Sequence, residues 1–137
     1  TNKKQKLVNQ LNTLGINYGI IFQIIDDNLD YFGTKDTGKD LGQDFFEGKI
    51  TLPIIILLKK AKNYEKEEIK KIFRKEKRNK KEFRHLIKLL IKYNVEKDCL
   101  TYAKKISIKS YQILDKFRNK QSELLKELLF TSLKRKS

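Results

Sequence analysis

The chain has 137 residues, which is enough for one domain with its own core and too few for two comfortable ones. Hydrophobic residues make up 39% and charged residues 36%, and no apolar run reaches the roughly 18 residues that predict a membrane-spanning helix. The net charge of +15 suggests three kinds of partner, namely nucleic acid, an anionic membrane surface or a phosphorylated ligand.

The N-terminal segment begins at Thr1, is polar and shows no signal peptide, and the whole chain lacks methionine. We therefore expect a piece of a longer product, a processed form or a truncated chain. The expected location is the cytoplasm, with an organelle as the alternative because no targeting region is part of the sequence.

Apolar residues recur every three or four positions between residues 4 and 32, which predicts one long amphipathic helix. They are Leu7, Leu11, Leu14, Tyr18, Phe22, Ile25, Leu29 and Phe32. Gly15 and Gly19 lie one turn apart inside this helix, where each glycine costs about 1 kcal/mol relative to alanine. Their presence predicts that a neighbouring backbone approaches here and that the helix lies deep in the fold.

Three aspartates, Asp26, Asp27 and Asp30, lie on nearly one face near the end of this helix. Their like charges repel, and the helix macrodipole disfavours negative charge at a C-terminus by about 0.3–1 kcal/mol for each group. Two interpretations are open. The cluster is either an acidic patch paired with nearby lysines or a site for a hard divalent cation such as Mg²⁺, which binds carboxylates, waters and substrate phosphates.

Residues 33–49 lose all periodicity, because glycines and turn-forming residues interrupt the pattern. We interpret them as an ordered loop of about fifteen residues, a length that is uncommon without a function. Lys39 and Lys49 each lie beside a glycine, so that backbone and ammonium can both approach a phosphate. Together with the aspartates they predict a diphosphate bound through Mg²⁺, although a solvated side chain remains the simpler interpretation of either lysine alone.

A further helix is predicted from Thr51, an N-cap residue, with Pro53 in the first turn. The apolar patterns that come after it predict helices over residues 65–78, 80–93 and 96–117, and a last one that begins at Ser122. Asn94 is a plausible stop for the second of these. The expected fold class is all-α, with helices packed side by side.

Three features of these later helices favour structural roles. The lysines between residues 59 and 105 are spread over several helix faces, which indicates solvated surfaces rather than a nucleic-acid site. Cys99, the single cysteine, lies in an apolar pattern and is expected to be a small buried hydrophobe in a reducing compartment. His85 is expected at the boundary of a helix face rather than as a catalytic base.

Three motifs in fixed order resemble those of the trans-isoprenyl (polyprenyl) diphosphate synthases. The stretch YGIIFQIIDDNLDYFG at residues 18–33 is similar to their second aspartate-rich motif, and GKDLGQD at residues 38–44 and EGKITLP at residues 47–53 are similar to the segments after that motif. The last of the three is closer to long-chain synthases, such as octaprenyl diphosphate synthase, than to farnesyl diphosphate synthases. The strong similarity covers about residues 14–58.

The resemblance implies a helical bundle of the isoprenoid-synthase type, of which residues 1–137 would be the C-terminal portion of a single domain. Residues 4–58 would carry the motifs and residues 59–137 would support them. Asp26, Asp27 and Asp30 would bind Mg²⁺ shared with an allylic diphosphate, Asp26 most directly, and Gln23, Lys39 and Lys49 would contact that substrate. Diphosphate would leave the allylic substrate, and isopentenyl diphosphate would attack the resulting carbocation.

One departure from the family pattern is large. The family carries a first aspartate-rich motif with adjacent arginines, and nothing in this sequence matches it. The resemblance therefore implies a missing N-terminal half as a partner, with a second copy of the chain as a further one, and an isolated chain that is inactive. Two alternatives stay open: a non-catalytic basic helical module that binds nucleic acid or an anionic membrane, and the product of a decayed or split gene.

Overall fold

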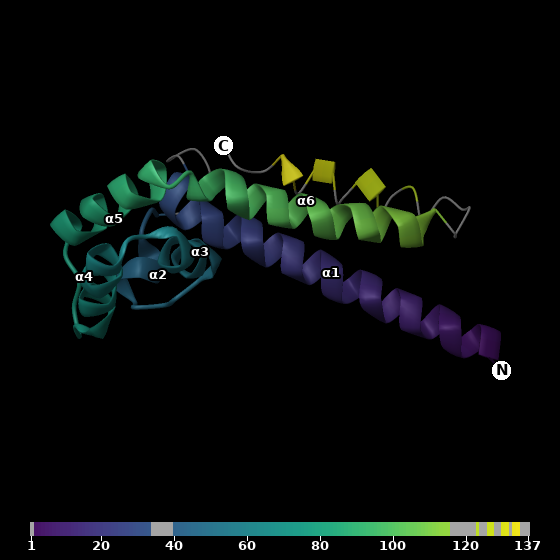
Figure 1. Cartoon of the computed structure of the whole chain (residues 1–137). Coiled ribbons are helices and arrows are strands. Elements are labelled where there is room, and N and C mark those ends of the chain that lie inside the picture. The colour runs from purple at the N-terminus through teal and green to yellow at the C-terminus, as the bar shows by residue number, and fades with distance from the viewer. Residues whose placement is uncertain are drawn as a thin grey trace. The chain divides into compact units, whose positions relative to one another are not determined.

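The computed structural model describes residues 2–33 and 40–115, and beyond these residues 123, 126, 127, 130, 131, 133 and 134. Its helices are α1 (Asn2–Phe32), α2 (Gln43–Phe46), α3 (Leu52–Lys60), α4 (Asn63–Arg74), α5 (Lys80–Lys92) and α6 (Val95–Leu114). Figure 1 shows them in chain order. No strand occurs in the described ranges, so the predicted all-α fold class is confirmed.

The chain divides into two compact units. One comprises Thr1–Ile25 with Leu100–Arg135, and the other comprises Asp26–Cys99 with Lys136–Ser137. Both α1 and α6 therefore contribute residues to both units.

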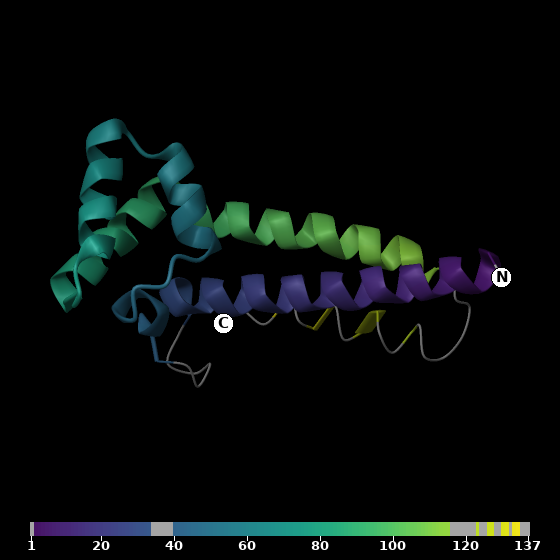
Figure 2. The same cartoon turned by 90° about the horizontal axis from the view of Figure 1, so that it is seen from below.

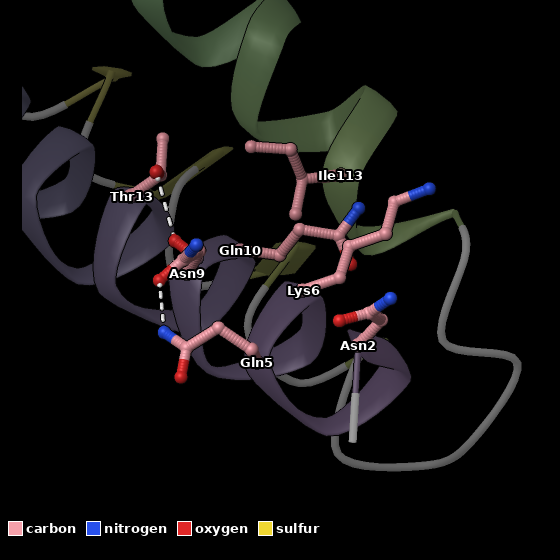
Figure 3. Close-up of a pocket in the computed structure, with 7 residues that line it drawn as sticks. All are labelled: Asn2, Gln5, Lys6, Asn9, Gln10, Thr13 and Ile113. Atoms are coloured by element: carbon pink, nitrogen blue, oxygen red, sulfur yellow. Dashed lines mark hydrogen bonds between the residues drawn. The ribbon is translucent and has the colours of Figure 1, made fainter.

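In the first unit, α1 and α6 run side by side in both views (Figures 1 and 2). They are antiparallel, since Ile113 near the end of α6 lines the same pocket as Lys6 and Gln10 near the start of α1 (Figure 3). The buried residues of this unit follow helical spacing: Leu14, Ile21, Ile24 and Ile25 on α1, and Ala103, Ser107, Ser110 and Leu114 on α6.

The predicted close approach of a backbone at Gly15 and Gly19 is wrong for the described chain. Both glycines are exposed, and a Cβ added at either would meet nothing within 4 Å. The buried side of α1 carries Leu14, Ile21 and Ile25, whereas the glycines share the opposite side with Ile16, which is 62% exposed. The helix buries one stripe, and the glycines lie outside it.

The second unit contains α2 to α5, with α3 packed against α5. Its α3 begins where predicted, after Thr51 and with proline in the first turn, but the Thr51 hydroxyl makes no hydrogen bond within the described part of the chain. A left-handed Asn94, with φ of 57°, comes after α5 and confirms the predicted stop.

The largest departures from the prediction lie in α4 and in the expected loop. Helix α4 ends at Arg74 rather than at residue 78, and the expected loop contains the one-turn helix α2. Residues 34–39 of that loop, Phe117 and the predicted cap Ser122 lie outside the described residues.

An aromatic cluster forms much of the core around α2. Phe45, with no exposed surface, lies 5.6 Å from Phe73 and 5.4 Å from Phe83 between ring centroids. Tyr31, at the end of α1, stacks on Phe83 at 6.0 Å. These rings bury apolar area and fix the end of α1 against α2, because aromatic pairs add specific geometry to burial. The cluster therefore gives the segment after the aspartates a defined position.

Candidate functional site

The three aspartates occupy the last two turns of α1 and differ sharply in exposure. Asp26 is partly exposed, Asp27 retains 8% of its surface and Asp30 retains none. The carboxylates thus run from the surface into the interior along one helix. Asp26 is the most exposed of the three, and its predicted binding of Mg²⁺ stays a prediction.

Asp30 makes a contact that the sequence did not indicate. Its Oδ1 accepts a hydrogen bond from the Asp44 backbone N–H at 3.1 Å, and its backbone carbonyl accepts one from the Gly42 N–H at 2.8 Å. Both bonds tie the start of α2 to the end of α1. A side chain predicted as a metal ligand therefore also fixes the course of the chain after α1.

The surroundings of these carboxylates carry a negative potential. The pKa of the Tyr31 hydroxyl lies far above its ordinary value, chiefly because the group is buried and further because Asp30, Asp44 and Asp27 are close, while the charge of Arg78 acts in the opposite direction. A negative potential from several carboxylates attracts a cation, and oxygen ligands of this kind suit Mg²⁺. The residues present therefore fit the predicted metal.

Lys49 is exposed and lies within this field. Its Nζ pairs with Glu47 Oε2 at 3.3 Å, and the hydrogen bond to Glu47 and the charge of Glu47, followed by the charges of Asp44 and Asp27, raise the pKa of the ammonium. Its backbone N–H donates to the Asp44 carbonyl at 2.9 Å. The structure thus places Lys49 in electrostatic reach of Asp27, although 22 residues separate them in the chain.

The other predicted substrate contacts are Gln23 and Lys39. Gln23 is exposed on α1, three residues before Asp26 on the same continuous helix. Lys39 lies outside the described residues. Its predicted contact with a diphosphate stays a prediction.

A metal would need ligands beyond these side chains. Over the described ranges, no three carboxylate, histidine or cysteine side chains converge as a complete metal site. Mg²⁺ ordinarily binds proteins through only one or two carboxylates and completes its shell with waters and substrate phosphates. The aspartates of α1 are suited to that shared mode of binding.

Three further features bear on the predicted roles. Cys99 is fully buried, and burial raises the pKa of its thiol to about 12, so it behaves as the expected small hydrophobe. His85 is exposed and lies 3.0 Å from Glu68 Oε2, as a surface residue. Arg78 contacts the segment that carries Lys49 and was missed, because the sequence placed it inside a helix.

A separate pocket of about 430 Å³ lies in the first unit (Figure 3). Amide and hydroxyl side chains line it, and Asn9 accepts hydrogen bonds from Gln5 and Thr13 at 2.9 Å. None of the predicted substrate or metal residues lines this pocket.

Comparison with known proteins decides the family. A sequence model described as Polyprenyl synthetase matches residues 1–90, which include every predicted site residue. The chain belongs to the Polyprenyl synthetase family. The resemblance inferred from the three motifs is therefore confirmed.

The relatives of this polyprenyl synthetase family member include long-chain synthases. The all-trans-nonaprenyl-diphosphate synthase of Rhodobacter capsulatus is 44% identical over 55 residues, which are 39% of this chain and 17% of the relative. Heptaprenyl diphosphate synthase component 2 of Geobacillus stearothermophilus is 40% identical over 55 residues, again 39% of this chain and 17% of the relative.

Solved structures extend the likeness beyond the motifs. A polyprenyl synthase from Caulobacter crescentus, crystallised with calcium and isoprenyl diphosphate, matches with a TM-score of 0.84 and 31% identity, over 94% of this chain and 40% of that one. A decaprenyl diphosphate synthase from Rhodobacter capsulatus matches with a TM-score of 0.85 and 27% identity, over 97% of this chain and 42% of that one. The chain thus spans about two fifths of these synthases.

The helices of the described ranges do not have the character of membrane spans. None of them combines the length and the apolar composition that crossing a bilayer requires.

Proposed function

We propose that this chain is the C-terminal part of a polyprenyl diphosphate synthase and contributes one half of its site for Mg²⁺ and an allylic diphosphate. The observation that carries the proposal is the link between the aspartate helix and the lysine segment. Asp30 binds the backbone of Asp44, and Asp44 in turn accepts a hydrogen bond from the backbone of Lys49. These two hydrogen bonds connect the aspartates of α1 to the segment that carries the Lys49 ammonium.

The chain's own residues would divide the work by charge. Asp26 and Asp27 would hold the metal, which supplies electrostatic stabilisation to the departing diphosphate when bound. Lys49 and Lys39 would donate hydrogen bonds to phosphate oxygens that remain charged. Gln23, one turn earlier on α1, would offer its amide to the same substrate. Isopentenyl diphosphate would be the second substrate.

The exposed side of α1 supports a further partner, the N-terminal half of the synthase. Apolar side chains along the first three quarters of this helix are open to solvent: Leu7, Val8, Leu11, Ile16, Ile20 and Phe22, with exposed fractions between 40% and 62%. Large apolar side chains left exposed in this number along one helix support an interaction with another part of the synthase. A homodimer in the cytoplasm, or in an organelle, completes the proposal.

Binding of magnesium and inorganic diphosphate to the chain tests the half-site. We expect calorimetry to detect binding that requires both ions, and Asp26→Asn to weaken it at least about tenfold, because a charged metal ligand is lost. Asp115→Asn removes the same charge from the residue after α6 and should leave the affinity unchanged. Equal affinities for the Asp26 variant and the unaltered chain would remove Asp26 from the site, and no binding by the unaltered chain would contradict the half-site itself.

A further inference from the structure

Arg78 joins the ends of two helices through one guanidinium group. It lies half-buried in the connection between α4 and α5. Its Nε donates to the Phe45 carbonyl at 2.8 Å and its Nη2 to the Phe46 carbonyl at 3.5 Å, both at the end of α2. The remaining contacts are with carbonyls in the last turn of α4 and just after it: Nη1 with Ile72 at 3.4 Å, Phe73 at 3.3 Å and Lys75 at 2.5 Å, and Nη2 with Glu76 at 3.4 Å.

An arginine is the side chain suited to this position. The last carbonyls of a helix lack intrahelical partners, and the end of a helix carries a partial negative charge. A planar guanidinium offers five N–H donors in a fixed arrangement, whereas an ammonium is a single centre with three donors. Arg78 can therefore cap α2 and α4 at once, and lysine cannot reproduce that geometry.

The capped end of α2 leads directly to Lys49. Gly48 has φ of +78°, and a Cβ on it would lie 2.7 Å from Arg78 Nη2, so the guanidinium packs closely against this turn. The Gly48 N–H donates at 3.0 Å to the Phe45 carbonyl, the same oxygen that Arg78 Nε binds. Arg78 thus contacts the turn immediately before Lys49.

The segment 42–49 is therefore fixed at both ends. Asp30 of α1 binds the Asp44 N–H at its start, and Arg78 binds the Phe45 and Phe46 carbonyls toward its end. The first anchor reaches Lys49 through the hydrogen bond from the Lys49 backbone N–H to the Asp44 carbonyl, and the second secures the turn between Phe45 and Lys49. We propose that Arg78 is a positioning residue that orders residues 45–49 and thereby holds Lys49 where it meets the diphosphate. The contact of Lys49 with the diphosphate rests on the proposed function.

Amide hydrogen exchange on the whole chain tests the ordering. Arg78→Gln should speed exchange at the amides of Glu47, Gly48 and Lys49 at least tenfold, while the amides of α5 exchange as before. Arg78→Lys keeps the charge and should give the same pattern, because the forked geometry is lost. Arg84→Gln removes an exposed arginine from α5 and serves as the matched control. Unchanged exchange at these three amides in Arg78→Gln would overturn the proposal.

A double-mutant cycle tests whether Arg78 acts through Lys49. Arg78→Gln should weaken the binding of magnesium and inorganic diphosphate severalfold in the chain that retains Lys49, and by much less in a Lys49→Gln background. A purely structural role would give equal losses in both backgrounds, and unchanged affinity in Arg78→Gln would exclude positioning; either result overturns the proposal.

The two proposals fail in different ways. If the unaltered chain binds no magnesium diphosphate, the half-site is wrong and Lys49 has no diphosphate to meet. The exchange measurement then still decides whether Arg78 orders residues 45–49. If Asp26→Asn weakens binding while Arg78→Gln does not, the half-site stands and the role of Arg78 is refuted.

Discussion

Gly48 and Gly15 occupy opposite environments, although the sequence marks both only as glycines. Gly48 has a positive φ of +78° and lies against Arg78, whereas Gly15 is exposed inside α1 with no atom within 4 Å of an added Cβ. We expect Gly48→Ala to lower the free energy of unfolding by about 1–2 kcal/mol or more, since an L-residue is strained there. Gly15→Ala should raise it by about 1 kcal/mol, because alanine favours a helix interior. Urea unfolding of both variants measures the difference.

The two alanine substitutions are expected to change the free energy of unfolding in opposite directions, so each result tests one of the two environments. A loss of stability in Gly15→Ala would indicate that a part of the molecule does approach α1 at that position. A neutral Gly48→Ala would show that the turn before Lys49 can relax, and would weaken the view that this turn is rigid.

Substitutions of Asp26 and of Asp30 should have different effects on the free energy of unfolding when it is measured without ligand. Asp30 is fully buried and accepts the Asp44 N–H, so Asp30→Ala should lower the free energy of unfolding by about 1–3 kcal/mol. Asp26 is partly exposed, and Asp26→Ala should change stability by no more than about 0.5 kcal/mol. Thermal and urea unfolding in the absence of Mg²⁺ provide the test, and equal losses in the two variants would contradict a structural role for Asp30.

Helical spacing identified this aspartate group but could not show which of its members is buried. Spacing is a local property, and it correctly places all three carboxylates near one face of α1. Burial of Asp30 depends on the return of the chain at Asp44, fourteen residues later. Pairings over such distances are set by tertiary packing, which a single sequence does not reveal.

At the level of elements, Glu65 secures the start of α4. Its Oε1 accepts hydrogen bonds from the Lys62 backbone N–H at 3.0 Å and from the Tyr93 hydroxyl, and its Oε2 accepts one from Lys92 Nζ at 2.9 Å. Hydrogen bonding by Tyr93, Lys62 and Lys92, in that order, lowers the pKa of this carboxyl from 4.5 to about 2. The ionised form is therefore favoured in the folded chain.

This lowered pKa predicts a specific loss of stability in acid. The stabilisation by Glu65 is present above the unfolded pKa of 4.5 and is lost as the pH falls toward the folded value of about 2. Glu65→Gln should be less stable than the unaltered chain at pH 6, and the difference should shrink as the pH approaches 2. Glu67→Gln, on the exposed side of α4, provides the control. Melting curves from pH 6 to 2.5 measure the trend, and a constant difference between the curves would contradict it.

The elements that were predicted well are those with local signals. Periodicity placed α1, α3 and α5 within two residues, because stripes, caps and stops are encoded in neighbouring residues. The one-turn helix α2 and the early end of α4 were not predicted. Both depend on Phe45 within the aromatic cluster and on Arg78 between the two helix ends, which are contacts across about thirty residues.

At the level of the whole molecule, the motifs carried more information than the composition. The charge of +15 left several classes of partner open, whereas three motifs in order gave the family that the match over residues 1–90 confirms. The exposed glycines on α1 show the limit of the same reasoning. They predicted a close neighbour, and none lies there in the described chain, which spans 40% to 42% of the synthases of known structure.

Prenyl transfer by the chain alone is the most direct test at this scale. The sequence contains one aspartate-rich cluster, and on the proposed function a diphosphate bound by this cluster alone would lack most of the charge stabilisation that its departure needs. We expect no incorporation of labelled isopentenyl diphosphate into extractable product when the chain, an allylic diphosphate and Mg²⁺ are mixed. Supplying the N-terminal half of a related synthase should restore incorporation, and Asp26→Ala in this chain should then lower the rate by at least about a hundredfold. Incorporation by the chain alone would show that one cluster suffices, and full activity of the Asp26 variant in the restored enzyme would remove Asp26 from catalysis.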